Sequence, residues 1–209
     1  MSRASSIIPP AGVKIAGTGI AVPERVLSNA DLEKIVETSD EWIVQRTGIR
    51  ERRIVDERTS TTDLATDAAR MAIENAGLEP GDLDLVICAT ITPEMLCPAS
   101  ACRIVDNLGA IPCGAMDVSI ACTGFVAALN MAANFIRTGM YRHVVAIGAD
   151  ALSEVTNWED RRTCVLFGDG AGAAVVSASD DPDQGCLYQT MHSDGGKWRE
   201  LYLPRQQRD

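Results

Sequence analysis

The 209-residue chain is 46% hydrophobic, which is enough to bury a sizeable core in one domain with part of a second. Its 19 Lys and Arg against 29 Asp and Glu give a net charge of −10, which argues against nucleic acid or an anionic membrane surface as the main partner. The first ten residues lack a signal-peptide core, no apolar run reaches membrane-spanning length, and the seven cysteines follow no zinc-binding pattern, so the sequence predicts a reduced, cytoplasmic protein without a metal site.

The first third of the chain is predicted to contain one strand and two short helices. A loose segment over residues 1–11 is expected before the strand, and a proline ends the strand. Polar residues stand where each helix would begin, as helix caps do. The expected elements are a strand over 13–20, a helix capped by Ser28 or Asn29 that runs through Val36, a helix capped by Ser39 or Asp40 that ends near Gly48, and a basic stretch over 49–58.

Strands and helices alternate through the middle of the chain, and the apolar strands are typical of a sheet covered on both faces. An amphipathic helix opens at Thr61 or Thr62 and ends at Gly77. Its shared inner face is expected to consist of Leu64, Ala68, Met71, Ala72 and Ala76. The helix from Thr123 to Gly139 is apolar nearly all round, so we expect it to be buried on nearly every face. The other expected elements are a helix over 98–108 and a strand whose last residues are 117–121. Further strands are expected over 83–89, 144–148, 163–167, 173–177 and 184–192.

Cys122 is the strongest candidate for a catalytic side chain. It stands where the strand ending over 117–121 joins the apolar helix, so unpaired backbone N–H groups and the helix dipole would stabilise a thiolate and lower the thiol pKa. Gly124 allows a tight turn and close access to the sulfur, as in a nucleophile elbow. The alternative is a buried core cysteine, which is the commonest fate of this residue.

Two further motifs suggest anion binding. The glycine-rich stretch 168–172 is similar to a phosphate loop, but such a loop opens a helix, and strand-like residues follow here; a tight turn between two strands is the preferred interpretation. The arginines of 49–58 and the Arg161-Arg162 pair are either solvated surface or a grip on the phosphates of a substrate. Trp42 beside Arg46 supports the second, since an indole and a guanidinium can sandwich a purine; otherwise Trp42 belongs to the core.

The remaining thiols and both imidazoles are expected to be structural. His143 is expected at the surface, and His192 has no visible partner in the sequence. A cysteine in a buried strand behaves as a small apolar group, and none of the six shows a catalytic pattern. These residues are Cys88, Cys97, Cys102, Cys113, Cys164 and Cys186.

Three stretches of the chain resemble β-ketoacyl-acyl carrier protein synthase III. The first is 38–52, which reads Thr-Ser-Asp-Glu-Trp-Ile-Val and then Arg-Thr-Gly-Ile-Arg-Glu-Arg. The second is the elbow 117–125. The third is 161–174, which ends in Phe-Gly-Asp-Gly-Ala-Gly-Ala-Ala. The tryptophan/arginine motif separates this branch from wider thiolase-like relatives. The resemblance implies an α/β, thiolase-like fold in a homodimer: a mixed sheet with a buried central helix and covering helices, built from two similar halves.

The same resemblance implies an acyltransferase that initiates fatty acid synthesis and needs no cofactor. An acyl primer would pass from coenzyme A to Cys122; malonyl-acyl carrier protein would then lose CO2 and attack the thioester, giving a 3-ketoacyl product. Cys122 matches the nucleophile, and its backbone N–H would help to form the oxyanion hole. Thr38, Trp42, Arg46 and Arg161 match positions that contact coenzyme A, whereas Arg162 departs from the small residue expected beside Arg161.

The chain is shorter than the family pattern. The family's His, in a His-Gln-Ala-Asn-like motif, and its Asn stabilise the decarboxylation transition state, but neither has a counterpart here, and His143 and His192 match neither position. The resemblance therefore implies a truncated second half, with residues 1–11 as lead-in, 12–180 as the nucleophile half and 181–209 as the start of the second. Alternatives are a non-catalytic fragment or associating subunit, and a polyketide- or quinolone-type priming synthase on the same fold.

Overall fold

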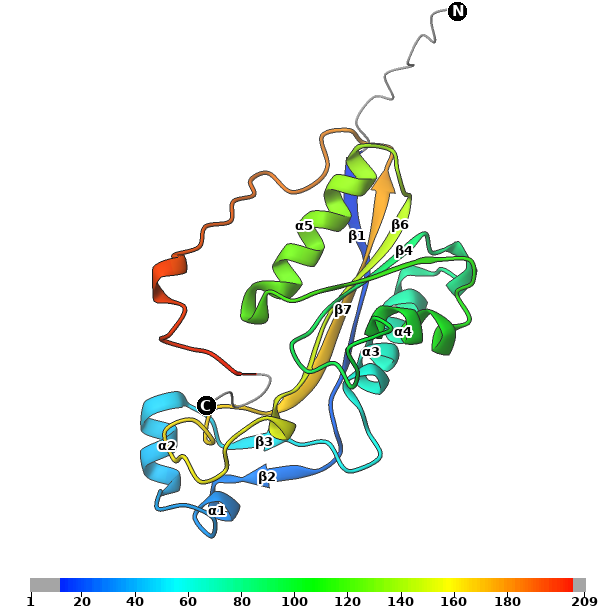
Figure 1. Cartoon of the computed structure of the whole chain (residues 1–209). Coiled ribbons are helices and arrows are strands. Elements are labelled where there is room, and N and C mark those ends of the chain that lie inside the picture. The colour runs from blue at the N-terminus through cyan, green and yellow to red at the C-terminus, as the bar shows by residue number, and fades with distance from the viewer. Residues whose placement is uncertain (1–11, 205–209) are drawn as a thin grey trace, which may run out of the picture.

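A five-stranded mixed sheet forms the centre of the computed structural model, which describes residues 12–204. β4 runs parallel to β5 and β6, whereas β7 runs antiparallel to β1 and β6 (Figure 1). In order across the sheet, the strands are β1 (Gly12–Ala21), β7 (Asp169–Ser179), β6 (His143–Ala151), β4 (Leu85–Ala89) and β5 (Gly114–Val118). The expected mixed sheet is confirmed, and the lead-in predicted over residues 1–11 lies outside the described residues.

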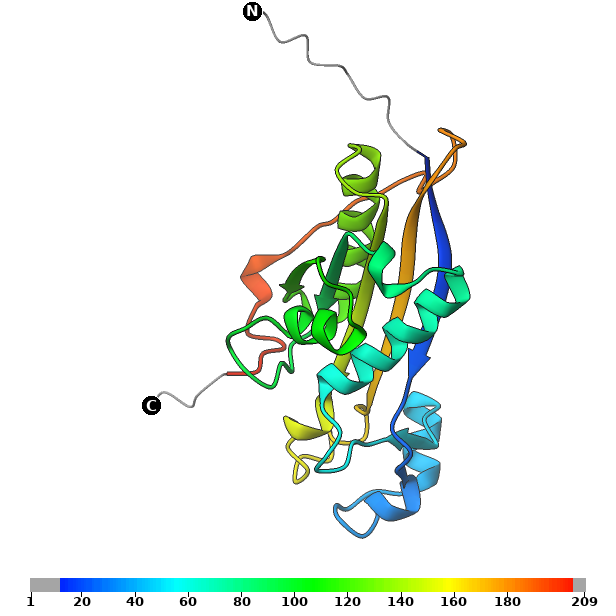
Figure 2. The ribbon, with the colours of Figure 1, turned by 90° about the vertical axis from the view of Figure 1, so that its right-hand side faces the viewer.

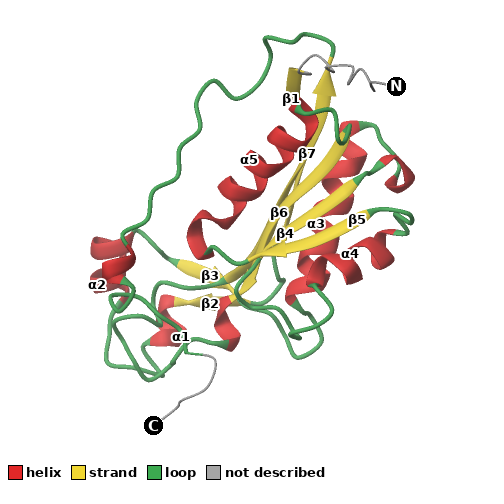
Figure 3. Ribbon diagram, turned by 45° about the horizontal axis from the view of Figure 1, so that its top comes forward, coloured by secondary structure: helices red, strands yellow, loops and turns green. Residues whose placement is uncertain are grey.

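Helices cover both faces of the sheet, with α3 and α4 on one face and α5 on the other (Figures 2 and 3). Their bounds are α3 (Thr61–Ala76), α4 (Ser100–Leu108) and α5 (Gly124–Arg137). Successive residues of β4 point to opposite faces, so Val86 and Cys88 pack towards α3 and α4, whereas Leu85 and Ile87 pack towards α5. Both faces of the strand are therefore apolar, which explains its continuous apolar sequence.

The sequence correctly predicts where α3 begins and ends. Ser60 and Asp63 form a reciprocal capping box, and Gly77 ends the helix with a φ of 67°. Most of the expected inner face is buried, but Met71 is 42% exposed, and its sulfur lies 3.4 Å from the Ile20 nitrogen. The prediction for Met71 is wrong because β1 is an edge strand, and within residues 12–204 no further strand lies beside it to cover that flank of the helix.

A smaller subdomain packs at one end of the sheet, below it in Figure 1. It consists of β2 (Val26–Ser28), α1 (Asn29–Leu32), α2 (Asp40–Thr47) and β3 (Glu51–Arg53), and we call it the β2–β3 subdomain. Its core also contains Cys164 and Val165, from much later in the chain. Ser28 and Ser39 cap the two helices as predicted, but α1 ends before Val36, because Lys34 and Ile35 donate to Asp31 and Leu32 in i→i+3 turns instead of continuing the helix.

The later part of the chain departs most from the sequence prediction. Residues 163–167 form hydrogen-bonded turns rather than a strand, and residues 184–192 form no strand. The glycine-rich stretch is not a turn, because Asp169 to Gly172 belong to β7, where Gly172 pairs with Ile20 on one side and Gly148 on the other. Backbone pairing on both sides outweighs the local preference of glycine for turns.

The helix α5 is buried on one face only within residues 12–204. Ala128 and Ala132 are fully buried against the sheet, whereas Val126 on the opposite face is 56% exposed. The expectation of burial on nearly every face is therefore wrong for the described chain. Residues 184–190 pass over the outer face and leave a cavity of about 710 Å³ between themselves, α5 and β1. In the same described range, none of the helices is both long and apolar enough to cross a bilayer.

Candidate active site

Cys122 lies at the join between β5 and α5, as predicted, although the strand already ends at Val118. A short 3-10 helix, η2 (Ala121–Thr123), carries the residue, and its thiol is exposed, so the alternative of a buried core cysteine is wrong. Ala121 has a φ of 43°, a left-handed conformation that costs a non-glycine residue about 1–3 kcal/mol. Such strain persists only where surrounding structure imposes it, and it is typical of a nucleophile elbow.

The start of α5 is held close to the sheet. Gly148 of β6 faces Phe125, and a Cβ atom at Gly148 would lie only 3.0 Å from the Phe125 Cβ. A larger residue at this position would push the first turn of α5 outwards. The close approach therefore sets where the helix begins and where the Cys122 thiol emerges, at the end of α5 that points towards the β2–β3 subdomain (Figure 1).

A buried hydrogen-bond cluster fixes the connection that follows β4. Asp150, near the end of β6, accepts hydrogen bonds from Thr90 Oγ1 (3.1 Å), the Ile91 N–H (2.8 Å) and Thr92 Oγ1 (3.1 Å). Because β4, β5 and β6 are parallel, this cluster lies at the same edge of the sheet as the turn that leads to Cys122. The predicted site did not include this cluster; the available signal was an aspartate at the end of an apolar strand.

Asp117 anchors the far end of that connection. Its carboxylate accepts the backbone N–H groups of Ser100 (2.7 Å) and Ala101 (2.9 Å), at the start of α4. Since Ala99 in the cap position has no side-chain acceptor, Asp117 supplies the cap from the neighbouring strand. The residues between β4 and α4 are thus tied down at both ends, next to the strand that leads to Cys122.

The side chains of Trp42, Arg46 and Arg161 meet on the β2–β3 subdomain. Ser39 caps α2 by accepting the Trp42 N–H, and the partly buried Trp42 indole lies on the surface of the subdomain core. The guanidinium carbon of Arg46 lies 4.8 Å from the ring centroid, and that of Arg161 lies 5.0 Å from it. Both distances are cation–π contacts. Two cations and one indole thus form a positively charged aromatic surface on an acidic chain.

The fourth predicted contact, Thr38, immediately precedes the cap of α2, and its hydroxyl is buried with no hydrogen-bond partner among residues 12–204. A buried hydroxyl without a partner is costly, so this position suits a donor or acceptor from a ligand. Arg162 points elsewhere: its side chain is 84% exposed and pairs with Asp160 at 3.0 Å, which also holds the pKa of Asp160 below its usual range. Arg162 therefore does not share the Trp42 surface.

The basic stretch 49–58 is not one surface patch. Arg50 and Arg58 are exposed, but Arg52 is buried, and Arg53 donates hydrogen bonds to the Pro23 and Glu24 carbonyl groups. For Arg52, the interpretations as solvated surface and as a phosphate grip are both wrong. Its side chain is directed into the subdomain by three backbone and side-chain acceptors.

Residues 116–195, which include the elbow, match the family described as 3-oxoacyl-[acyl-carrier-protein (ACP)] synthase III. The β-ketoacyl-[acyl-carrier-protein] synthase III of Caldanaerobacter subterraneus subsp. tengcongensis is 53% identical over 190 residues, covering 91% of this chain and 57% of that relative. Over these residues the chain is similar to the β-ketoacyl-acyl carrier protein synthase III family.

Solved structures of the synthase III type confirm the thiolase-like fold. The 3-oxoacyl-[acyl-carrier-protein] synthase III of Aquifex aeolicus overlaps with a TM-score of 0.80 at 55% identity, covering 81% of this chain and 55% of that one. The priming β-ketosynthase of the R1128 polyketide pathway overlaps with a TM-score of 0.81 at 38% identity, covering 84% and 53%. The chain spans somewhat more than half the length of the synthase III relatives that it matches.

The other thiols of the chain do not share the setting of Cys122. Cys88 and Cys164 are buried, as predicted, and burial raises the pKa of both thiols; Cys164 lies in a turn rather than a strand. Cys113 is half-buried, and burial raises its pKa to about 11. The three remaining cysteines are exposed but lie at no strand-to-helix elbow: Cys97, Cys102 and Cys186.

The two histidines are both tied to hydroxyl groups. His143, at the start of β6, is half-buried, with Nδ1 2.9 Å from Ser177 Oγ, and His192 Nε2 lies 2.8 Å from Thr190 Oγ1, a partner that the sequence did not reveal. Within residues 12–204, no three His, Cys, Asp or Glu side chains are placed to hold a metal ion.

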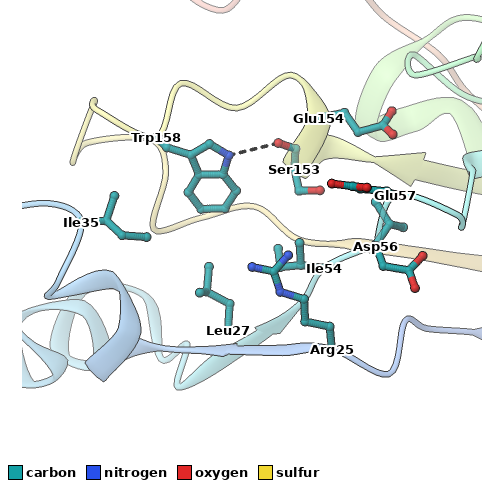
Figure 4. Close-up of a pocket in the computed structure, with 10 residues that line it drawn as sticks. Arg25, Leu27, Ile35, Ile54, Asp56, Glu57, Ser153, Glu154 and Trp158 are labelled. Carbon is teal, nitrogen blue, oxygen red and sulfur yellow. Dashed lines mark hydrogen bonds between the residues drawn. The ribbon is translucent and has the colours of Figure 1, made fainter.

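A cavity of about 420 Å³ lies beside the β2–β3 subdomain (Figure 4), and its lining includes no residue of the stretches 38–52, 117–125 and 161–174. Trp158, Leu27 and Ile54 form its apolar wall, and the Trp158 indole N–H donates to the Ser153 carbonyl at 3.2 Å. Arg25, which directly precedes β2, also lines the cavity. None of the four positions matched to coenzyme A contacts lines it, and sequence analysis gave no signal for it.

Proposed function

We propose that this chain carries the acyl-accepting site of a β-ketoacyl-acyl carrier protein synthase III. One observation supports this most directly: an exposed Cys122 at a strained elbow, in a chain that is 53% identical to a relative named as this synthase. The elbow presents the thiol to solvent at the start of a fourteen-residue helix.

The proposed first step is acyl transfer from coenzyme A to Cys122. The thiolate attacks the thioester carbonyl carbon, a carbon–sulfur bond to Cys122 forms, the bond to coenzyme A breaks, and the coenzyme A thiolate leaves. The backbone N–H of Cys122 is proposed to help stabilise the negative charge on the carbonyl oxygen during this step. No cofactor is needed, because the thioester is already activated.

The proposed second step is a decarboxylative Claisen condensation with malonyl-acyl carrier protein. Loss of CO2 leaves a carbanion on the carrier-bound acyl group, which attacks the acyl-Cys122 carbonyl. The carbon–sulfur bond to Cys122 breaks, the thiolate is regenerated, and a 3-ketoacyl-acyl carrier protein is released. This reaction would initiate fatty acid synthesis, and it is a proposal for the whole protein.

We propose that the nucleotide of coenzyme A binds at Thr38, Trp42, Arg46 and Arg161. The indole offers a stacking face, the arginines offer charge to phosphates, and the Thr38 hydroxyl lacks a partner among the described residues. A purine between Trp42 and Arg161 needs a gap of about 7 Å, two van der Waals spacings. The Arg161 guanidinium carbon lies only 5.0 Å from the Trp42 ring centroid, so the Arg161 side chain must swing away when the base enters.

We also propose a cytoplasmic homodimer in which residues 12–180 form the nucleophile half and residues 181–209 begin the next. The free edge of β5 supports the dimer: within residues 12–204 this strand pairs with β4 alone, and an unpaired edge can accept a strand from a second copy. Size-exclusion chromatography with light scattering tests this, and a monomer at micromolar concentration would contradict it.

Polyketide priming is the second candidate, favoured by the overlap with the R1128 priming ketosynthase at 38% identity. Both functions use the same acyl-cysteine chemistry and differ in the primer and the carrier protein. Supplying the intact protein with carrier proteins of fatty acid and of polyketide synthesis separates them: 3-ketoacyl product with the first alone supports fatty acid initiation.

Mass spectrometry after mixing the intact protein with acetyl-CoA tests the proposed function. We expect one acetyl group, located by peptide mapping on Cys122. Cys122→Ala should abolish the adduct, whereas Cys102→Ala, which alters another exposed thiol, should leave it unchanged. Acetylation that persists in Cys122→Ala would refute the assignment of the nucleophile.

A further inference from the structure

A buried arginine connects two segments that carry the proposed nucleotide site. Arg52 of β3 is 6% exposed, and its guanidinium donates to Leu27 O (3.3 Å), Asn29 Oδ1 (2.9 Å) and Val165 O (3.0 Å). No carboxylate in residues 12–204 forms an ion pair with it, and its Nε has no partner there. A buried cation held only by neutral acceptors is costly, so hydrophobic packing does not explain its presence.

The acceptors of Arg52 lead to both sides of the Trp42 surface. Asn29 also donates to Asp40 Oδ1 at 2.7 Å and to Ile49 O at 2.9 Å, and Asp40 is the first residue of the helix that carries Trp42. Val165 lies 113 residues after Arg52 in the chain and belongs to the run of turns that begins beside Arg161. The guanidinium thus spans the gap between the α2 side and the Arg161 side.

We propose that Arg52 is a positioning residue, which sets the spacing between Trp42 and Arg161 through the Asp40–Asn29–Arg52–Val165 hydrogen-bond chain. The proposal rests on the function proposed above, in which these two side chains hold the nucleotide of coenzyme A. Arg52 itself touches neither the ring nor the thiol; it acts on the backbone that presents them.

The geometry explains why a planar, multidentate cation is needed. Cys164 and Val165 also pack into the subdomain core, but apolar contacts are non-directional and fix only how deeply the turn sits. The hydrogen bond to Val165 O fixes its direction as well. This matters because the Arg161 side chain must move when a base enters, and the move is reproducible only if its backbone stays in place.

The test compares two acyl donors that differ in the nucleotide. The rate of Cys122 acylation is measured in the intact protein with acetyl-CoA and with acetyl-N-acetylcysteamine, a thioester without a nucleotide. For Arg52→Met we expect the preference for acetyl-CoA to fall by about tenfold or more, the effect of losing a charge-assisted hydrogen bond. The loss should appear as a higher KM for acetyl-CoA, with the rate at saturation and the rate with the small thioester retained.

Arg53→Met is the matched control. Arg53 is adjacent in the same strand and also donates to carbonyl groups, but those of Pro23 and Glu24, so its loss should leave the preference for acetyl-CoA unchanged. Arg52→Lys retains the charge, but a single amine replaces the two guanidinium nitrogens that bond Asn29 and Val165 separately. We expect an intermediate loss, and this variant decides the question if Arg52→Met does not fold.

Trp42→Ala separates failure of this inference from failure of the proposed function. If Trp42→Ala lowers the preference for acetyl-CoA and the Arg52 variants do not, the positioning role is refuted and the nucleotide site stands. If Trp42→Ala also leaves the preference unchanged, the nucleotide site itself is wrong. If the Arg52 variants are acylated more slowly by acetyl-CoA and by acetyl-N-acetylcysteamine to the same extent, the damage is general and the positioning role is likewise refuted.

Discussion

Asp169 is a single carboxylate that joins three segments of the chain. It is 6% exposed and accepts hydrogen bonds from the Val55 N–H (2.7 Å), the Ser153 N–H (2.8 Å) and Ser153 Oγ (2.6 Å). Val55 leads from the β2–β3 subdomain into α3, and Ser153 follows β6, so Asp169 at the start of β7 holds the subdomain against the sheet. The interaction is strong because the buried carboxyl group accepts three hydrogen bonds.

Removing this carboxylate should be costly. We expect Asp169→Ala to lower the free energy of unfolding by about 3 kcal/mol, because the buried Val55 N–H and the partly buried Ser153 N–H lose their acceptor. Urea denaturation followed by circular dichroism measures the change. Asp67→Ala, on the exposed side of α3, is the control and should stay within about 0.5 kcal/mol of the parent protein. Equal effects of the two substitutions would contradict the role assigned to Asp169.

At the scale of elements, α3 and β1 approach each other more closely than side chains normally allow. A Cβ atom at Gly19 would lie 2.2 Å from the Ala68 carbonyl oxygen and 2.6 Å from the Ala72 nitrogen, both of them backbone atoms of α3. These atoms cannot move without displacing the helix. The contact therefore depends on glycine in the strand and alanine in the helix, at positions on two elements that face each other.

We expect Gly19→Ala to destabilise the protein by about 1–3 kcal/mol, the usual cost of overpacking, because α3 must move away from the sheet. Thermal unfolding gives the change in free energy. Gly172→Ala provides the matched control in the adjacent strand β7, since an added Cβ there meets no atom within 4 Å. The explanation fails if Gly172→Ala proves as damaging as Gly19→Ala.

The sequence predicts elements well where the signal is local. α3 has its capping box and its terminal glycine within one segment, and α2 has Ser39 before it and Gly48 after it. β7 could not be predicted in full, because its glycine-rich start is a strand only through pairing with β1 and β6, which are distant in sequence. The same limit applies to α5, whose burial depends on what packs against it rather than on its composition.

At the scale of the whole molecule, the sequence alone located the candidate nucleophile but not the surroundings of the nucleotide site. The position of Cys122 followed from strand and helix patterns, and Trp42 and Arg46 are one helical turn apart. Arg161 lies far from Trp42 in the chain, so only the family resemblance paired them. Arg52 was misread because its three acceptors come together only in the folded chain.

Four hydrogen-bonded carboxylates link the stability of the fold to pH. Hydrogen bonds lower the pKa of Asp31, Asp56 and Asp160, with donors on Lys34 and Ser28, on Arg58 and Thr59, and on Arg162 and Thr163, respectively. For Glu94, burial raises the pKa, but hydrogen bonds from Thr62 outweigh it, so the net shift is downward. Each of these groups binds its proton less readily in the folded state than in the unfolded state.

Acid should therefore destabilise this protein by protonating these carboxylates. A depressed folded pKa contributes stability that is fully present above the unfolded values, 3.8 for Asp and 4.5 for Glu, and is lost as the pH falls through the folded values. We expect the urea midpoint to be flat from about pH 7 to 5 and to fall below about pH 4.5. Acid also neutralises the net charge of −10, and the reduced repulsion would stabilise the folded state. The measurements are therefore made in about 0.5 M NaCl, which screens this repulsion at every pH. Glu94→Gln, which cannot titrate, should differ most from the parent protein at neutral pH and converge with it in acid; a constant difference across that range would exclude Glu94 from the effect.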